Sequence, residues 1–232
     1  MANRVALILP ALDEEESLAP LLAELARYPL AQVIVADNGS RDRTAEVARR
    51  QGACVVQEPR RGYGAACLAG IAALRPEVDV VVFMDADGSD DPADLPRLLE
   101  PIERGQADLV IGSRVLGQRE AGALTPQQRI GNALATVLLR LLFGIRATDL
   151  GPFRAIRRSA LERLALRDPD FGWTVEMQIR AHRTGLRVVE IPVRYRRRRA
   201  GRSKISGTVS GTVRAGLKII GTILKYRLQP LH

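Results

Sequence analysis

The sequence has very few of the residues on which several common chemistries depend. Its 232 residues include two cysteines and two histidines, and aromatic residues make up 4% of the chain. Cys54 and Cys67 lie in Ala-rich apolar stretches without metal-site spacing, so we expect two buried thiols and no disulfide. His182 falls in the middle of an expected helix and His232 is the last residue, so neither is a promising general base.

Long apolar stretches are also missing. No run of 18 apolar residues occurs, so we expect no membrane-spanning helix. The first residues lack the layout of a signal peptide. We therefore expect a cytoplasmic protein whose contact with a membrane, where it has one, is peripheral.

Positive charge comes almost entirely from arginine and gathers in one part of the chain. Only three of the 35 basic residues are lysines, at positions 204, 218 and 225, and the net charge is +9. Residues 1–100 carry 10 basic and 17 acidic side chains, whereas residues 101–232 carry 25 and 9. Such a basic part favours an anionic partner, which is a nucleic acid, a phospholipid surface or a phosphorylated substrate.

The first 112 residues alternate between apolar runs and helical patterns. The apolar runs predict strands at about 4–9, 31–36, 53–57, 78–84 and 107–112. The patterns between them predict helices at about 14–27, 41–50, 63–75 and 92–103. This alternation indicates an α/β fold with a Rossmann-like, mostly parallel central sheet flanked by helices. Farther on, we expect helices at 129–143 and 172–184, a loop at 146–153 and short strands at 187–191 and 193–197.

Two aspartates follow the fourth apolar run directly, in the sequence Asp85-Ala86-Asp87. Ligands of open α/β sheets bind at the carboxyl ends of the strands, and two carboxylates there can bind one hard divalent cation. An acidic loop that only caps the next helix would show the same pattern. However, the polar segments 10–16 and 37–40 also follow strands and would lie along the same edge. Together they predict a nucleotide-diphosphate site that has no Walker lysine.

The C-terminal part is basic and amphipathic. Seven of the eleven residues from Arg194 to Lys204 are basic, and a helix is expected at about 205–228. Its apolar stripe comprises Val209, Val213, Leu217, Ile220 and Leu224. Such a helix lies in a membrane interface or packs on the sheet. We therefore expect one domain over residues 1–206, followed by an amphipathic helix over 207–232 that is a candidate for peripheral membrane contact.

Several ordered motifs resemble those of a known enzyme family. Its opening motif, Pro-x-x-Asn-Glu-x, is matched by Pro10 to Glu15 with aspartate at position 13. Its later motifs are matched by segments 36–44, 85–87, 111–114, 153–155 and 203–205. Over residues 4–206 the chain thus resembles a family-2 glycosyltransferase of the GT-A fold, in the branch of polyprenyl-phosphate glycosyltransferases similar to dolichol-phosphate mannose synthase. It departs from that branch at Ser89 and Asp90, where Gln and His are common.

The resemblance implies a role for each matched position. The sugar donor, a UDP- or GDP-linked sugar, would be bound by Pro10, Glu14, Asp37 and Asp85; beside these matched positions, Asp13 and Arg61 are further candidates for donor binding. Mg²⁺ or Mn²⁺ on its diphosphate would be held by Asp85 and Asp87. The acceptor, a lipid phosphate at the inner face of a membrane, would be bound by Arg114, Arg129, Arg198, Arg202, Ser203 and Lys204. The oligomeric state stays open.

The nature of the acceptor decides which catalytic groups are needed. A phosphate monoester has a second pKa around 6 and is largely ionised at neutral pH, so it needs no strong base. A hydroxyl acceptor would need one, and Asp149 and Glu176 are the candidates. Displacement at the anomeric carbon would invert its configuration.

Three other functions compete with transfer to a lipid phosphate. The same fold could act on a soluble hydroxyl acceptor. A sugar nucleotidyltransferase should carry a Gly-rich loop near the N-terminus, and segment 10–15 has none. A nucleic-acid-binding protein should interleave aromatic side chains with its basic ones. Only Tyr195 does so here, and we therefore expect no nucleic-acid partner; Arg196 and Arg197 are expected to be solvent-exposed.

Overall fold

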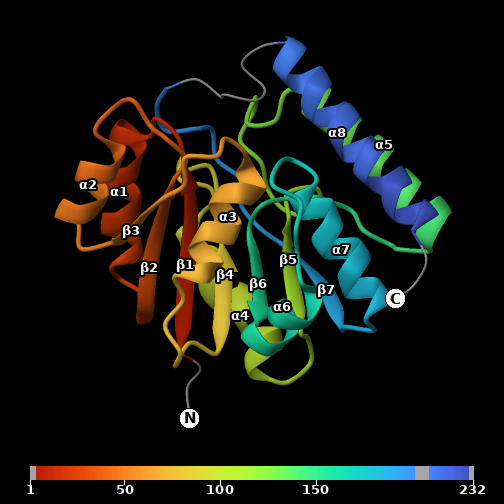
Figure 1. Cartoon of the computed structure of the whole chain (residues 1–232), viewed down its shortest axis with the longest axis horizontal. Helices are drawn as coiled ribbons and strands as arrows, with labels where there is room; N and C mark the ends of the chain where they lie inside the picture. The colour runs from red at the N-terminus through yellow and green to blue at the C-terminus, as the bar shows by residue number, and fades with distance from the viewer. Residues whose placement is uncertain (1–3, 202–208, 230–232) are drawn as a thin grey trace.

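The chain folds around one seven-stranded sheet (Figure 1). The computed structural model describes residues 4–201 and 209–229, without the side chains of residues 209, 210, 212 and 213. The strand order is β3-β2-β1-β4-β6-β5-β7. The strands are β1 (Val5–Ala11), β2 (Leu30–Asp37), β3 (Cys54–Gln57), β4 (Val80–Phe83), β5 (Leu109–Ser113), β6 (Arg154–Arg157) and β7 (Val188–Pro192).

Six of these strands run in one direction, and β6 runs antiparallel between β4 and β5. The five strands expected before residue 113 are confirmed, as is the one at 187–191. The sequence did not predict β6, because four residues with arginine at both ends lack the apolar run of a buried strand. Arg154 is nevertheless fully buried, since its guanidinium donates to the carbonyls of Gly151, Leu150 and Thr174.

Helices cover both faces of the sheet. One face packs against α1 (Glu15–Leu25), α2 (Thr44–Arg50) and α4 (Leu95–Glu103), which follows the short 3-10 helix Pro92–Asp94. The other face packs against α3 (Tyr63–Ala72), α6 (Arg158–Leu164) and α7 (Trp173–Arg183). These are two apolar layers around a mostly parallel sheet, so the predicted α/β class is confirmed. Helix α6 was not predicted.

Two further helices, α5 (Pro126–Phe143) and α8 (Val209–Leu228), lie side by side at one end of the sheet (Figure 1). A third apolar cluster joins them to α7 through Ala135, Leu139, Val175, Ile223 and Tyr226. Helix α5 begins at a capping box formed by Thr125 and Gln128 and ends at Gly144, which has a positive φ of 73°. Within residues 4–201 and 209–229, no helix combines the length and apolar character needed to cross a bilayer.

Two local predictions were wrong. Residues 193–197 do not form a strand, and only Tyr195 makes isolated bridges, to Asp90 and Arg119. Cys54 is exposed because it lies on the edge strand β3, whereas Cys67 is buried as expected.

The predicted apolar stripe of α8 is not the face by which this helix packs. Leu217 is 66% exposed and Leu224 is 48% exposed, while Ala215, Ile223 and Tyr226 are buried. The side chains of the first two stripe residues, at positions 209 and 213, lie outside the described part of the chain. Tertiary packing therefore uses the neighbouring face of the helix, and Leu217 and Leu224 of the stripe are left towards solvent.

Candidate active site

The paired aspartates lie where β4 ends, at the centre of the sheet. Gly88, with a φ of 73°, turns the chain away immediately after them. Asp87 is 8% exposed, and its Oδ1 accepts hydrogen bonds from the amide and the hydroxyl of Ser89 at 2.9 and 2.6 Å. Asp91 caps the next turn by accepting from the amide of Ala93. Asp91 is therefore the residue that caps the next turn, and Asp85 and Asp87 take no part in this cap.

Negative charge is concentrated behind this turn. Burial raises the pKa of Asp85 to about 7, and the nearby charge of Asp87 adds to the rise. Burial also raises the pKa of Asp90 well above its usual range, with contributions from Asp85 and Asp87. Asp90 is fully buried; one oxygen accepts from the Asp85 amide and the other has no partner among the described residues. Such a group of carboxylates favours a cation at the turn.

The donor atoms at this turn suit a hard divalent cation. The described residues include no cluster of three or more His, Cys, Asp or Glu side chains that could enclose a metal. Two carboxylates alone fit Mg²⁺ or Mn²⁺, because these ions usually keep open positions for phosphate oxygens and water. We therefore expect Asp85 and Asp87 to hold such an ion together with a diphosphate.

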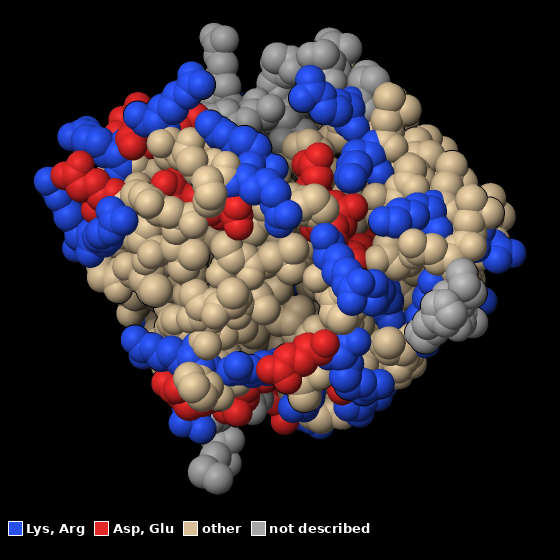
Figure 2. Space-filling view, viewed as in Figure 1, with Lys and Arg blue, Asp and Glu red and all other residues tan. Residues whose placement is uncertain are grey.

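A basic segment, residues 194–199, lies along this acidic edge; we call it the basic strap. Arg198 binds Glu14 through Nη1 at 2.5 Å and Asp87 through Nη2 at 3.1 Å. Arg196 binds Asp91 at 2.6 Å and also binds a glutamate of α1. Figure 2 shows acidic side chains gathered between basic ones near the carboxyl ends of the strands. The prediction that Arg196 is simply solvated was wrong, because acidic residues of the N-terminal part neutralise the strap.

A first cavity, the donor pocket, opens beside the paired aspartates and has a volume of about 360 Å³. The predicted donor residues Pro10, Glu14, Arg61 and Asp85 all line it, together with Asp87 and Arg198. Asp13 and Asp37 do not. Asp13 lines a smaller neighbouring pocket, and its Oδ1 accepts from the amide of Arg41. Asp37 is 4% exposed and binds the amide of Ser40, so it shapes the turn after β2.

Sequence reasoning missed several residues of the donor pocket, among them Asn38, Tyr63 and Phe171. Asn38 accepts from the amide of Gly62 and donates to the carbonyls of residues 58 and 60, which fixes the turn before α3. The signal for Asn38 was its place in the segment after β2. Tyr63 and Phe171 gave no signal, because they come from segments more than 100 positions apart that only the fold brings together.

A second cavity, the acceptor groove, shares Tyr63, Asp85, Asp87, Phe171 and Arg198 with the donor pocket. Its volume is about 330 Å³. The groove begins at the charged residues and continues between α5 and α8. The residues that line it there are Gln127, Gln128, Gly131, Asn132 and Leu134 of α5 and Ala215, Gly216, Ile219 and Ile220 of α8. The groove therefore joins a charged end to a passage that is apolar along α8 and mixed along α5.

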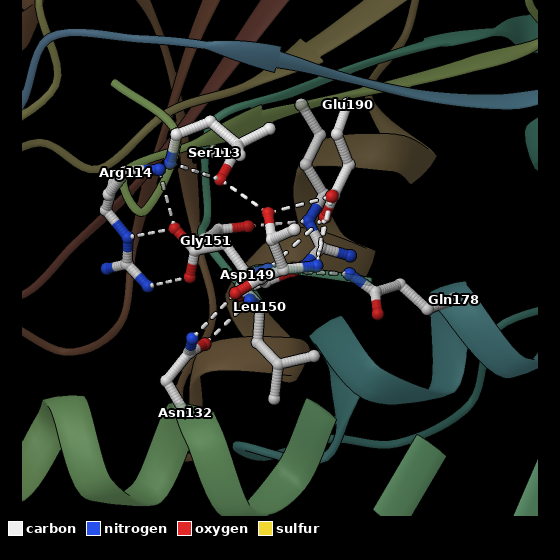
Figure 3. Close-up of polar contacts among 11 residues, drawn as sticks. Ser113, Arg114, Asn132, Asp149, Leu150, Gly151, Gln178 and Glu190 are labelled. Atoms are coloured by element: carbon white, nitrogen blue, oxygen red, sulfur yellow. Dashed lines mark hydrogen bonds and ion pairs between the residues drawn. The ribbon is translucent and has the colours of Figure 1, made fainter. Parts of the chain in front are cut away.

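Arg114 lies at the polar end of the acceptor groove and is held there by Asp149 (Figure 3). Its Nε and Nη2 donate to the two Asp149 oxygens at 2.8 and 2.7 Å. The guanidinium also lies over the ring of Tyr195, 5.1 Å from the centroid. Glu190 accepts hydrogen bonds from the amides of Thr148 and Asp149 and thereby fixes the loop 146–153, which carries Asp149. Asp149 is fully buried and its carboxylate already binds Arg114. The prediction that Asp149 acts as a general base was therefore wrong.

Glu176 and Arg129 also differ from their predicted roles. Glu176 is fully buried in α7, lines neither cavity, and accepts four hydrogen-bond donors. A carboxylate that is fully occupied and lies away from the cavities cannot act as a base there. Arg129 is exposed on α5 and is absent from both cavity walls, since Gly131 and Asn132 face the groove instead. The predicted phosphate ligands Arg202, Ser203 and Lys204 lie outside the described residues.

The chain was compared with protein families and with known proteins. The family model "Glycosyl transferase family 2" matches residues 6–165. An undecaprenyl-phosphate mannosyltransferase of Micrococcus luteus is 36% identical over 221 residues, covering 90% of each chain. A polyprenol monophosphomannose synthase of Mycolicibacterium smegmatis is 33% identical over 223 residues, covering 89% of this chain and 82% of the relative.

A solved structure shows the same fold. It is glucosyl-3-phosphoglycerate synthase from Mycobacterium tuberculosis in complex with Mn²⁺, uridine diphosphate and glucosyl-3-phosphoglycerate. The TM-score is 0.80 at 25% identity, and the alignment covers 99% of this chain and 81% of that one. The match over residues 6–165, the relatives above 30% identity and the shared architecture lead to one conclusion: the chain belongs to glycosyltransferase family 2 and has the GT-A fold.

Proposed function

We propose that this glycosyltransferase moves a sugar, with inversion, from a nucleotide-diphosphate sugar to a polyprenyl phosphate. One observation carries the proposal: two cavities meet at Asp85, Asp87 and Arg198. The donor pocket leads to this point from the acidic edge of the sheet. The acceptor groove leads to it from the apolar space between α5 and α8. An amphiphilic acceptor with an anionic head fits that second passage.

The donor pocket suits a nucleotide sugar. Pro10, Glu14 and Arg61 line its wall together with the paired aspartates. A solved relative binds Mn²⁺ and uridine diphosphate in the same fold, which supports a UDP- or GDP-linked donor. A metal ion bound by Asp85 and Asp87 would neutralise the charge that develops on the leaving diphosphate. Arg198, which already lies against Asp87, would add a second positive charge near the leaving diphosphate.

The acceptor end of the groove favours a phosphate over an alcohol. Arg114 keeps its guanidinium at the groove because Asp149 binds two of its nitrogens, which orients the third. An arginine in this position suits phosphate oxygens. Neither predicted base is available, since the carboxylates of Asp149 and Glu176 are both engaged. A phosphate monoester needs none, and an oxygen of this phosphate would attack the anomeric carbon from the face opposite the leaving group.

The outer faces of α5 and α8 suit the surface of a membrane, and we propose that the protein binds its inner face peripherally. Leu141 on α5 is 75% exposed and Leu217 on α8 is 66% exposed, and five further large apolar side chains of α5 and α8 are exposed at 46–85%. Basic residues of both helices would contact anionic headgroups. Leu141→Ser with Leu217→Ser should reduce co-sedimentation with anionic vesicles severalfold. Val188→Thr, at the exposed edge strand, is the control.

A transfer assay tests the proposed reaction. Purified protein, Mn²⁺ and a panel of UDP- and GDP-sugars would be incubated with vesicles containing a polyprenyl phosphate, and lipid-linked product measured by mass spectrometry. Arg114→Gln should lower transfer at least about 100-fold, as expected for a lost contact to the reacting charge. Arg49→Gln, at an exposed arginine of α2 that lies outside both cavity walls, should leave it unchanged. Transfer only to soluble hydroxyl compounds would contradict the proposal and favour the alternative acceptor.

A further inference from the structure

A short segment between α6 and α7, residues 167–171, lies between the donor pocket and α8; we call it the bridge segment. Asp170 and Phe171 line the donor pocket, and Phe171 also lines the acceptor groove. The carbonyl of Pro169 accepts from the amide of Ala65 at 2.8 Å, in the first turn of α3. The bridge segment is therefore bonded directly to the element that begins at the donor pocket.

Close packing makes this contact rigid. Gly62, at the start of α3, has a φ of 143°, and a Cβ placed there would lie 2.1 Å from the carbonyl oxygen of Pro169. A Cβ on Gly64 would lie equally close, 2.1 Å, to the carbonyl oxygen of Asp168. The two glycines allow the backbones to approach to contact distance. A displacement of the bridge segment would therefore be transmitted to the turn that carries Arg61 and Tyr63.

Glu176 holds the bridge segment from the other side. Its carboxylate accepts from the amide of Asp168 at 2.7 Å and from the amide of Arg167 at 3.1 Å. The same carboxylate accepts from the hydroxyl of Tyr226 on α8 at 2.5 Å. Arg180 donates to both partners, at 3.2 Å to Glu176 and 3.1 Å to the Tyr226 hydroxyl. One buried carboxylate thus joins the backbone of the bridge segment to α8.

A second link runs from α8 to the bridge segment. Thr222, one turn before Tyr226, donates to Oδ2 of Asp168 at 3.3 Å, and Lys218 lies 3.8 Å from the same oxygen. The other oxygen of Asp168 accepts from the amide of Asp170, a residue of the donor pocket wall. The three α8 residues are spaced four apart and so lie on one face of the helix. Adjacent residues of α8 line the acceptor groove.

We propose that Glu176 is a positioning residue that makes nucleotide binding depend on the docking of α8. The inference rests on the proposed function, because it assumes a nucleotide in the donor pocket and an acceptor against α8. Tyr226 and Thr222 lie in neither cavity wall, yet through Glu176 and Asp168 they determine where Asp170 and Phe171 stand. Binding of an acceptor against α8 then changes the affinity of the protein for the nucleotide. By linkage, binding of the nucleotide changes the affinity of the protein for the acceptor by the same factor.

Two conservative variants test this coupling without disturbing the packing. Tyr226→Phe keeps the ring and removes only the hydroxyl, and Thr222→Val keeps the shape of the side chain. Binding of UDP and of GDP, each with Mn²⁺, would be measured by calorimetry with and without polyprenyl-phosphate vesicles. We expect the double variant to bind the nucleotide at least about five-fold more weakly and to lose the response to vesicles. Tyr28→Phe and Thr136→Val, far from the bridge segment in the chain, are the matched controls.

The outcomes separate the inference from the proposed function. If the wild-type protein binds neither nucleotide, the proposed function fails and the inference falls with it. If it binds one and the double variant binds it equally well, with the same vesicle response, only the inference is overturned. Glu176→Gln gives an independent readout: a positioning role raises the donor KM with kcat within a few-fold. A collapse of kcat at unchanged KM would make Glu176 a catalytic base and overturn the inference.

Discussion

We expect Asp85→Asn to stabilise the metal-free protein above neutral pH. Burial and the charge of Asp87 raise the pKa of Asp85 from 3.8 to about 7. Between these two values the folded protein binds more protons than the unfolded chain. The free energy of unfolding therefore falls as the pH rises through this range, and the whole loss persists above it. Asparagine carries no charge and removes this cost.

The size of the effect follows from the pKa. One pKa unit corresponds to about 1.4 kcal/mol, so the rise from 3.8 to about 7 corresponds to roughly 4 kcal/mol for a fully shielded carboxylate. Asp85 keeps some solvent exposure, and we therefore expect about half of this, roughly 2 kcal/mol, at pH 8. The gain should shrink towards zero near pH 4, where aspartic acid is protonated in both states.

Urea unfolding with a chelator, followed by circular dichroism at pH 4, 6 and 8, measures this gain. Asp79→Asn is the control, because Asp79 is an exposed aspartate at the opposite end of the same strand and asparagine can still accept from the Arg4 amide. Adding Mn²⁺ should stabilise the wild-type protein at pH 8 and not the variant. A variant no more stable than the wild type at pH 8 would refute the explanation that carboxylate crowding is the cost of the site.

The remaining predictions concern stability and the donor pocket. Hydrogen bonds to Arg187 lower the pKa of Asp108 to about 2, so this pair stabilises the fold above pH 4 and is lost as the pH falls towards 2. Because the pair is partly solvated, Asp108→Asn should cost about 1 kcal/mol at pH 7 and nothing at pH 2, as measured by chemical unfolding. Gly62→Ala should destabilise the protein by about 2 kcal/mol or more and weaken nucleotide binding, because the methyl group meets the Pro169 carbonyl. The same substitution at Gly52, where a Cβ meets no atom within 4 Å, reports the effect of a positive φ alone.

The sequence allowed most of the sheet to be predicted, as well as the place of the paired aspartates at the carboxyl end of β4. A strand with a continuous apolar run, such as β4, and the aspartates that follow it can be recognised from the local sequence alone. No knowledge of the neighbouring strands is needed. Strand β6 has no such pattern, because its stability comes from its two neighbours and from carbonyls that satisfy Arg154. Cys54 was misjudged for a related reason, since apolar composition does not say which strand lies at an edge.

The roles of individual charged residues were harder to predict. Asp149 and Glu176 are acidic residues in expected site segments, and nothing local shows that a distant arginine or tyrosine already binds them. The Asp149 partner is 35 positions away and the Glu176 partner on α8 is 50 positions away. Arg129 was assigned by its place in a motif, whereas the rotation of α5 directs Gly131 and Asn132 to the groove. Such pairings are properties of the packed structure.

The basic strap has a consequence for synthesis of the chain on the ribosome. Its arginines meet partners made much earlier: the Arg198–Glu14 contact spans 184 positions and the Arg196–Glu24 contact spans 172. While the last fifth of the chain is still missing, β5 lacks β7 and the acidic edge lacks its counter-charges. Contacts of such long range form slowly and late. A nascent chain therefore acquires a complete sheet edge only after the basic strap has been made, and a truncation before β7 would leave one edge of β5 unpaired and the acidic edge uncompensated.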